Sequence, residues 1–184
     1  MKIVVKNLSK KFNNVFAVQD ITFDIPKNKT LGLLGPNGCG KTTSIGMMLG
    51  LIEPCKGTIL YDDKDINKTD KNYLLGQMNF ASPYIELPKK LTVKQNLEVY
   101  GRLYGVVNLT QRILEISSDL NLKSFLEKKT GELSSGQKNR VSLAKSLINK
   151  PKILFLDEPT ASLDPDIGDF VRNYIEDYKS KNDL

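Results

Sequence analysis

The segment "GELSSGQKNR", from Gly131 to Arg140, decides how the rest of the chain is interpreted. It places two serines, a glycine and a glutamine directly before a basic stretch that has the periodicity of a helix. The segment has no metal-ligand spacing and no obvious acid, base or nucleophile. Its purpose therefore has to be found from the motifs around it.

Composition sets the class of protein. The chain has 184 residues, which suits one domain or a little more, and its hydrophobic content of 40% is ordinary for a soluble globular protein. The apolar runs are too short to span a bilayer, and the N-terminus lacks the apolar core of a signal peptide. We therefore expect a cytoplasmic protein. The chain has no histidine, which excludes a His-based triad or a His-ligated metal site within it.

The net charge of +6 comes mainly from lysines spread along the chain, with only four arginines. Readers of bases and phosphates favour arginine, so we expect no nucleic-acid partner. The two cysteines, Cys39 and Cys55, have no CxxC or histidine partner and are expected to be free thiols.

The sequence "GPNGCGKTT" matches the phosphate-binding pattern G-x-x-x-x-G-K-[ST]. It follows the apolar run 30–35, which predicts a buried parallel strand, and opens a predicted helix over about 40–52. The glycines let backbone N–H groups turn towards a phosphate, Lys41 would reach the β- and γ-phosphates, and Thr42 would ligate Mg²⁺. The candidate nucleotide-binding residues here are Gly35, Pro36, Asn37, Gly38, Cys39, Gly40, Lys41, Thr42 and Thr43.

The sequence "ILFLDEP", residues 153–159, supplies a second half of the site. Four apolar residues predict a buried strand that carries Asp157 to its end, where its carboxylate would hold Mg²⁺. Glu158 follows directly and is expected to act as the general base that orients or polarises the attacking water.

The remaining elements follow from periodicity. Residues 2–8 and 17–25 alternate like antiparallel strands joined by a turn at Asn13 and Asn14. Thr92 is a predicted N-cap. Further strands are expected at 57–62, 77–81 and 152–157, and helices at 93–106, 109–119, 135–149 and from Pro165 towards Tyr178.

Together, "LSSGQ" and "DEPTASLDP" make the chain resemble the nucleotide-binding domain of ATP-binding cassette (ABC) proteins, over essentially all 184 residues. The resemblance implies an α/β fold: a P-loop NTPase (RecA-like) core, an antiparallel β subdomain, and a helical lobe. The lobe is inserted between "GPNGCGKTT" and "ILFLDEP", which correspond to the family's Walker A and Walker B motifs. It implies one domain, 1–184, with 1–82 and 151–184 as nucleotide-binding core and 83–150 as the lobe.

The resemblance also gives the polar segment a purpose. It implies that two such domains, expected to be a homodimer, close head-to-tail around two ATP molecules and that each completes the other's site. The residues expected to contact ATP in trans are Ser134, Ser135, Gly136, Gln137 and Asp164. An ordinary N-cap would explain a serine but not the neighbouring glycine and glutamine. The family usually has "LSGGQ", so Ser135 replaces a glycine here.

Two further assignments rest on the resemblance. Phe12 falls where the family stacks an aromatic ring on adenine, with Val18 near it; Phe12 as a core residue of the first hairpin is the alternative. The family's glutamine that links Mg²⁺ to the helical lobe has no clear counterpart. Ser82 is expected in its place as a magnesium ligand, because Gln77 comes too early.

The family places a histidine on a strand beyond the catalytic glutamate, and the chain ends at Leu184 before such a strand. The resemblance therefore implies a C-terminally incomplete domain without this sensor of the γ-phosphate, and it leaves hydrolysis by this polypeptide open.

The function implied is that of the ATP-hydrolysing subunit of a transporter at the inner face of the cell membrane, working with separate permease subunits. The sequence "LTVKQNLEVYGRLYGV" resembles the exporter branch that moves drugs and polysaccharides. Two alternatives are open: a soluble ABC ATPase that is half of a translation-factor-type tandem, and a truncated remnant deficient in hydrolysis.

Overall fold

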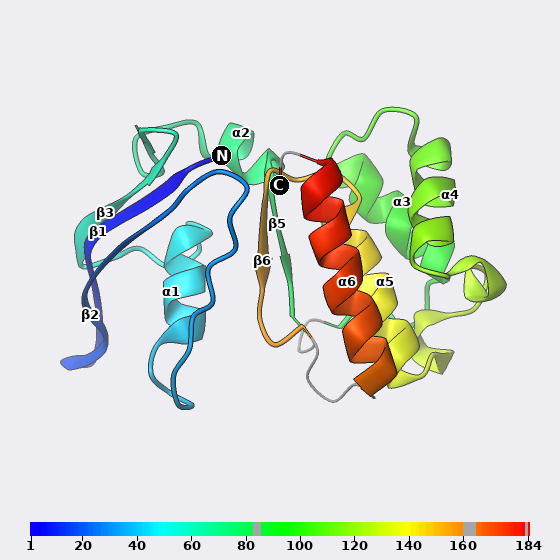
Figure 1. The fold of residues 1–184 in the computed structure, drawn as a ribbon, viewed down its shortest axis with the longest axis horizontal. Helices are drawn as coiled ribbons and strands as arrows, with labels where there is room; N and C mark the ends of the chain where they lie inside the picture. Colours follow the sequence, from blue (N-terminus) through cyan, green and yellow to red (C-terminus); the bar gives the residue numbers. More distant parts are fainter. Residues whose placement is uncertain (83–85, 160–164, 183) are drawn as a thin grey trace. The chain divides into compact units, whose positions relative to one another are not determined.

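The computed structural model describes residues 1–82, 86–159, 165–182 and 184 (Figure 1). The chain separates into two compact units, the first built on residues 1–78 and the second on residues 79–182. The division expected from the resemblance, with a helical lobe at 83–150, stays a prediction. Within the described ranges no helix is long and apolar enough to cross a membrane.

The first unit is built on an antiparallel sheet with the strand order β2-β1-β3-β4. The long hairpin of β1 (Ile3–Phe12) and β2 (Val15–Ile25) turns at Asn13 and Asn14, whose φ angles are 45° and 66°. Asparagine tolerates this left-handed backbone, which a tight hairpin needs at both central positions. The expected hairpin and its turn are confirmed. The other strands are β3 (Lys56–Tyr61) and β4 (Lys64–Asp65).

Alternation along β1 buries Ile3 and Val5 in the core of this unit, and a shift in the strand register after Val5 brings Leu8 into the core as well. The helix α1 (Lys41–Met48) contributes its buried last turns, and the hydroxyl of the buried Tyr61 donates to the carbonyl of Met48 at 2.5 Å. The helix is shorter than the predicted 40–52, because Gly50 takes a φ of 68° just beyond it and reverses the chain. The short helix α2 (Lys71–Gly76) completes the unit.

The expectation of a buried strand at residues 30–35 is wrong for this structure. The segment forms no strand, it is drawn as coil in Figure 1, and Leu34 is 96% exposed. A parallel strand is stable only when neighbouring strands supply its ladder of hydrogen bonds. The sheet of the first unit is completed by β1 to β4 and contains no ladder partner for this segment.

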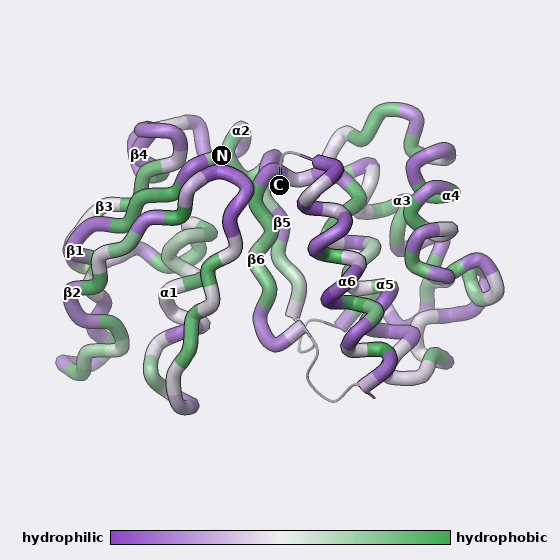
Figure 2. The backbone as a smooth tube through the Cα atoms, viewed as in Figure 1, coloured by the Kyte–Doolittle hydropathy of each residue, from purple (hydrophilic) through white to green (hydrophobic). Residues whose placement is uncertain are grey.

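The second unit combines the pair β5 (Met78–Ala81) and β6 (Ile153–Leu156) with a group of helices. Figure 2 shows β6 as a hydrophobic segment, as its sequence predicts. Thr92 forms the expected N-cap, in a capping box with Gln95. The helices are α3 (Val93–Leu103), α4 (Leu109–Asp119), α5 (Ser135–Leu147) and α6 (Pro165–Lys181), with 3₁₀ turns η1 (Lys123–Phe125) and η2 (Thr130–Glu132).

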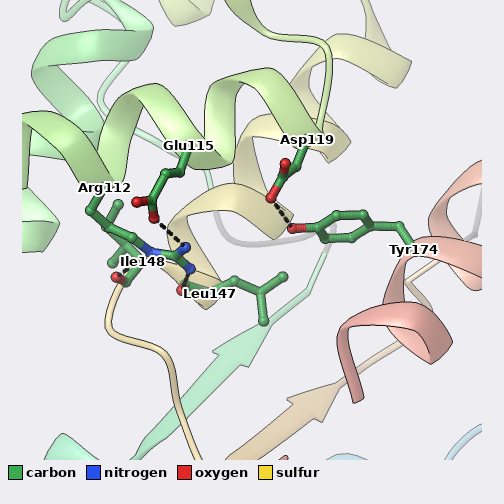
Figure 3. Close-up of polar contacts among 6 residues, drawn as sticks. All are labelled: Arg112, Glu115, Asp119, Leu147, Ile148 and Tyr174. Carbon is green, nitrogen blue, oxygen red and sulfur yellow. Dashed lines mark hydrogen bonds and ion pairs between the residues drawn. The ribbon is translucent and has the colours of Figure 1, made fainter. Parts of the chain in front are cut away.

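A buried arginine holds the end of α5 (Figure 3). Arg112 on α4 donates from Nε to the carbonyl of Ile148 at 3.2 Å and from Nη2 to the carbonyl of Leu147 at 2.7 Å. These carbonyls lie at the helix C-terminus, where the helix itself offers no donor. The positive guanidinium also complements the negative end of the helix dipole. Arg112 therefore acts as a C-terminal cap supplied by a neighbouring helix.

The helix α4 also contacts α6 (Figure 3). The hydroxyl of Tyr174 donates to Oδ2 of Asp119 at 3.4 Å. Burial, followed by the nearby charge of Asp119, raises the pKa of Tyr174, so the phenol stays a neutral donor at ordinary pH. α4 thus has polar contacts to both α5 and α6.

We expect Arg112→Met to lower the free energy of unfolding by about 2–4 kcal/mol, because two buried carbonyls lose a charged donor. Glu115→Gln is the matched control: it removes an ion pair of 3.5 Å from a side chain that is 44% exposed. That change should cost less than about 0.5 kcal/mol. Urea unfolding of both variants checks this, and equal losses would show that the ion pair, not the cap, carries the stability.

Candidate functional site

The glycine-rich loop of the first unit is pressed against β2. Gly38 and Gly40 have φ angles of 80° and 93°, a left-handed backbone that glycine adopts without strain. A Cβ atom at Gly40 would lie 2.1 Å from the carbonyl oxygen of Ala17 and 3.0 Å from Cγ2 of Val18. Glycine is therefore required at position 40 for two reasons: its left-handed φ and its close approach to the backbone of β2.

The loop leads into a helix start that no side chain caps. Gly40 is the N-cap of α1 and makes no side-chain cap hydrogen bond, whereas α3 and α5 both have capping boxes. Thr42 is exposed in the first turn. The Lys41 ammonium lies over the loop and donates to the carbonyls of Gly35 at 2.8 Å and Pro36 at 2.9 Å. An open helix N-terminus with an adjacent ammonium fits a phosphate group.

The other loop residues line an exposed surface. Asn37 and Cys39 are exposed, Thr43 is half-buried, and the N–H of Cys39 donates to the Pro36 carbonyl at 3.3 Å. Cys39 Sγ lies 4.0 Å from Lys41 Nζ. Both Cys39 and Cys55 are free and exposed, which confirms the expected unpaired thiols.

Phe12 ends β1 with 49% of its surface exposed, and Lys10 Nζ lies 5.2 Å from its ring centroid. The alternative assignment of Phe12 to the core of the hairpin is therefore wrong. Stacking on adenine stays a prediction for this open ring. Val18 is buried on β2 beside Gly40, so its side chain packs against the glycine-rich loop.

In the second unit, two of the predicted magnesium ligands directly follow the paired strands β5 and β6. The N–H of Asp157 donates to the carbonyl of Ala81 at 2.9 Å, which places Ser82 and Asp157 where β5 and β6 end. Ser82 is buried, and Asp157 is half-buried. Gln77 belongs to the first unit, where it caps the C-terminus of α2 and donates to the Tyr73 carbonyl at 3.4 Å.

Glu158 follows Asp157 and is exposed, with a φ of 50°. The next residue, Pro159, accepts a hydrogen bond through its carbonyl from Nδ2 of Asn139 on α5, at 3.0 Å. Sequence reasoning missed Asn139. Nothing in the sequence around Asn139 marks it as functional, because its hydrogen-bond partner, Pro159, lies on a loop twenty positions away.

The donor set suits magnesium. In the second unit Ser82 and Asp157 offer a hydroxyl and a carboxylate, and oxygen ligands are what Mg²⁺ prefers. Thr42, in the first unit, offers a further hydroxyl. Within the part of the chain that the structure describes, no group of three His, Cys, Asp or Glu residues could hold a metal ion. Such a sparse set fits Mg²⁺ that is held by one carboxylate together with substrate phosphates.

The polar segment that opens α5 has a local explanation. The hydroxyl of Ser134 accepts from the N–H of Gln137 at 3.3 Å, and Oε1 of Gln137 accepts from the N–H of Ser134 at 3.0 Å. Gly136 is buried, and a Cβ there would lie 2.7 Å from Cδ1 of Ile167. The expectation that an N-cap explains only the serine is therefore wrong: a capping box explains the glutamine and packing explains the glycine. Ser135 is exposed, and Asp164 lies outside the described residues.

These motifs agree with a family match. The sequence profile of the ABC transporter family matches residues 18–161. The chain belongs to the ABC transporter family. It is 38% identical over 165 residues to the probable multidrug ABC transporter ATP-binding protein YbhF of Escherichia coli, covering 89% of this chain. It is 32% identical over 183 residues to the ABC transporter ATP-binding protein NatA of Bacillus subtilis, covering 96% of this chain and 74% of NatA.

The chain spans only part of several ABC relatives, 28% of YbhF and 53% of the Nod factor export ATP-binding protein I of Burkholderia lata. Among solved structures, CbiO1 of Clostridium perfringens, part of the ABC transporter complex CbiONQ, is similar with a TM-score of 0.86 at 26% identity. That likeness covers 99% of this chain and 75% of CbiO1. The expected P-loop NTPase fold of an ABC cassette is confirmed.

We expect Gly40→Ala to destabilise the first unit by about 2–4 kcal/mol, because left-handed strain adds to a clash with the Ala17 backbone. Gly38→Ala is the control, since its φ is also positive but no atom lies within 4 Å of the added Cβ. It should lose about 1 kcal/mol from strain alone. Urea unfolding measures both; equal losses would mean that the contact with β2 is unimportant.

Proposed function

We propose that the chain is the ATP-binding and ATP-hydrolysing subunit of an ABC transporter. It would dimerise head-to-tail around two ATP molecules and drive export through separate membrane subunits. The observation that carries this proposal is the uncapped start of α1, with left-handed glycines before it and the Lys41 ammonium over the loop. The family match supports it.

In this proposal the loop residues bind the phosphates. Backbone N–H groups of the loop and of the first turn of α1 would face the phosphates, where the helix dipole favours negative charge. Lys41 would exchange its two carbonyl acceptors, at Gly35 and Pro36, for phosphate oxygens. A charged acceptor gives the ammonium a stronger hydrogen bond than a neutral carbonyl does.

Thr42, Asp157 and Ser82 would hold Mg²⁺, which when bound neutralises charge on the phosphates. Glu158 would orient or polarise the attacking water. Its exposed side chain leaves it accessible to solvent water. Asn139 fixes the carbonyl of Pro159 and so steadies the turn that carries both acidic residues.

The start of α5 would contact the γ-phosphate held by a second copy of the chain. Its capping box engages the N–H groups of Ser134 and Gln137, and it leaves those of Ser135 and Gly136 outside the box. We therefore assign these two N–H groups, with the exposed hydroxyl of Ser135, as the phosphate contacts. A bacterial ABC transporter cassette that is 25% identical was solved as a dimer, which supports pairing.

Export is the direction we propose. Relatives include, by name, a multidrug transporter subunit and a Nod factor exporter, but also importers of spermidine and putrescine, of Fe³⁺ ions and of sulfate. The resemblance of residues 91–106 to the exporter branch favours export. The permease would be a separate membrane protein, with this chain at the cytoplasmic face.

The test is the solution mass of the Glu158→Gln protein in ADP and in Mg-ATP, by light scattering. Without the general base, ATP should persist and trap a closed dimer, so the mass should double in Mg-ATP only. The control is the double variant Lys41→Ala, Glu158→Gln, which should stay monomeric because its phosphate loop lacks the ammonium. A monomer in Mg-ATP despite intact ATP binding would contradict the trans contact.

Alkylation of Cys39 tests the placement of the nucleotide. We expect N-ethylmaleimide to lower ATP affinity at least tenfold (about 1.4 kcal/mol) in Cys55→Ala protein, because the adduct would occupy the phosphate loop. Cys39→Ala protein keeps the other exposed thiol, Cys55, and should bind ATP unchanged after the same treatment. Fluorescent nucleotide titration measures both. Unchanged ATP affinity in alkylated Cys55→Ala protein would place the nucleotide elsewhere.

A further inference from the structure

We propose that the second unit carries a binding surface for anionic phospholipid headgroups. We call it the lysine ledge; its residues lie in segments 86–94 and 123–138. These segments contain seven of the chain's lysines and three glutamates, a net charge of four out of the six of the whole chain. The lysines are Lys89, Lys90, Lys94, Lys123, Lys128, Lys129 and Lys138, and all are exposed.

Backbone hydrogen bonds bring the two segments together. The N–H of Val93 donates to the carbonyl of Lys128 at 3.0 Å, and the N–H of Lys94 donates to that of Leu126 at 2.9 Å. The N–H of Gly131 donates to the carbonyl of Lys89 at 3.1 Å. The backbones that carry lysines more than thirty positions apart in sequence therefore lie side by side. The expectation that the lysines are spread along the chain overlooks this pairing.

Buried polar side chains make the ledge a fixed structure. The hydroxyl of Thr130, which is 3% exposed, donates to the carbonyl of Pro88 at 2.8 Å. The side-chain amide of Asn96, which is 1% exposed, donates to the carbonyl of Thr92 at 3.0 Å. These hydrogen bonds add to those of the backbone, because the carbonyl of Pro88 also accepts from the N–H of Leu91 at 3.2 Å and that of Thr92 from the N–H of Asn96 at 2.9 Å. The lysines thus project from an ordered backbone.

The acidic residues neutralise only part of this charge. Glu86 pairs with Lys89 at 2.8 Å and Glu127 pairs with Lys94 at 3.7 Å. The hydrogen bond and charge of Lys89, with a smaller contribution from the charge of Lys138, lower the pKa of Glu86. Within the described residues, Lys90, Lys123, Lys128 and Lys129 form no ion pair.

The residue types favour lipid headgroups over a protein or a nucleic acid. Protein interfaces are rich in aromatic residues and arginine and poor in lysine. Single-stranded nucleic acids are bound by stacking aromatic rings. The ledge has neither: its one aromatic side chain, Phe125, is 3% exposed, and the exposed apolar residues Val99, Leu103 and Val107 lie outside it. Clustered lysines with long flexible stems suit the diffuse negative charge of a bilayer surface.

The inference deepens the proposed location at a membrane, but its test needs neither nucleotide nor permease. The purified chain is sedimented with vesicles of phosphatidylcholine alone and with vesicles of about 3:1 phosphatidylcholine and phosphatidylglycerol. We expect binding to the anionic vesicles only, and we expect it to disappear when the salt concentration rises to about 0.5 M.

The ledge variant replaces Lys90, Lys123, Lys128 and Lys129 by glutamine. Each lysine contributes about a fivefold increase in partition coefficient, so the variant should bind at least about a hundredfold more weakly. The control removes four exposed lysines from the first unit, Lys27, Lys29, Lys56 and Lys71, and so has the same net charge. The control should keep most of its binding. Urea unfolding verifies that both variants are folded.

Three results would overturn the proposal: equal binding to both kinds of vesicle, no binding to anionic vesicles, or an equal loss in the ledge and control variants. The last would mean that net charge alone drives the binding. Because none of these measurements involves ATP, a failure of the ledge leaves the nucleotide proposal standing. A failure to form the ATP dimer likewise leaves the ledge standing.

Discussion

The start of every helix has backbone N–H groups without partners in the helix, and the proposed function rests on how this chain satisfies them. At α3 and α5 the sequence supplies capping boxes, Thr92 with Gln95 and Ser134 with Gln137. At α1 it supplies no cap, and instead places a left-handed glycine at the N-cap position and a lysine directly after it. The start of α4, at Asn108, likewise has no side-chain cap, but it follows no glycine-rich loop and has no lysine directly after the N-cap. The proposal gives the start of α1 to a phosphate, which would complete it from outside.

The helix α5 connects the functional parts of the second unit. Arg112 holds its C-terminal carbonyls, and Lys145, whose pKa is lowered by burial, donates to the carbonyl of Phe80 on β5 at 3.3 Å. Asn139 reaches the turn that carries the two acidic residues. Because Asn139 lies on the helix that residues 134–137 open, a displacement of that segment would reach the turn through Asn139. This is a physical route by which contact with a second copy would affect the acidic residues.

Features coded by neighbouring residues were predictable from sequence. The hairpin turn at Asn13 and Asn14, the N-cap at Thr92 and the apolar run of β6 depend on a few adjacent side chains. The strand expected at 30–35 depends on partners distant in sequence, which an apolar run does not specify. The lysine ledge was missed for the same reason, because hydrogen bonds between distant segments gather its charges.

The candidate site was predictable as a set of motifs, but its physical basis was not. Sequence analysis expected Gly136 and Gln137 to be unexplained by a cap, yet Gln137 completes a capping box and Gly136 gives room to Ile167. Packing against α6 has no signature in the segment itself. A residue can thus be required by the fold at the same position where the family resemblance assigns it a ligand. Mutation of Gly136 would disturb both, so only measurements that separate folding from dimerisation identify its function.

The backbone at Glu158 is held by hydrogen bonds on both sides. Its neighbours are both fixed: Asp157 by the hydrogen bond of its N–H to Ala81, and Pro159 by the hydrogen bond of its carbonyl to Asn139. Between these anchors Glu158 takes a φ of 50°, which costs a residue with a side chain about 1 kcal/mol. Such strain persists only where the surroundings determine the backbone on both sides. The strained residue is the proposed general base, and the same anchors that strain its backbone hold it directly after the proposed magnesium ligand.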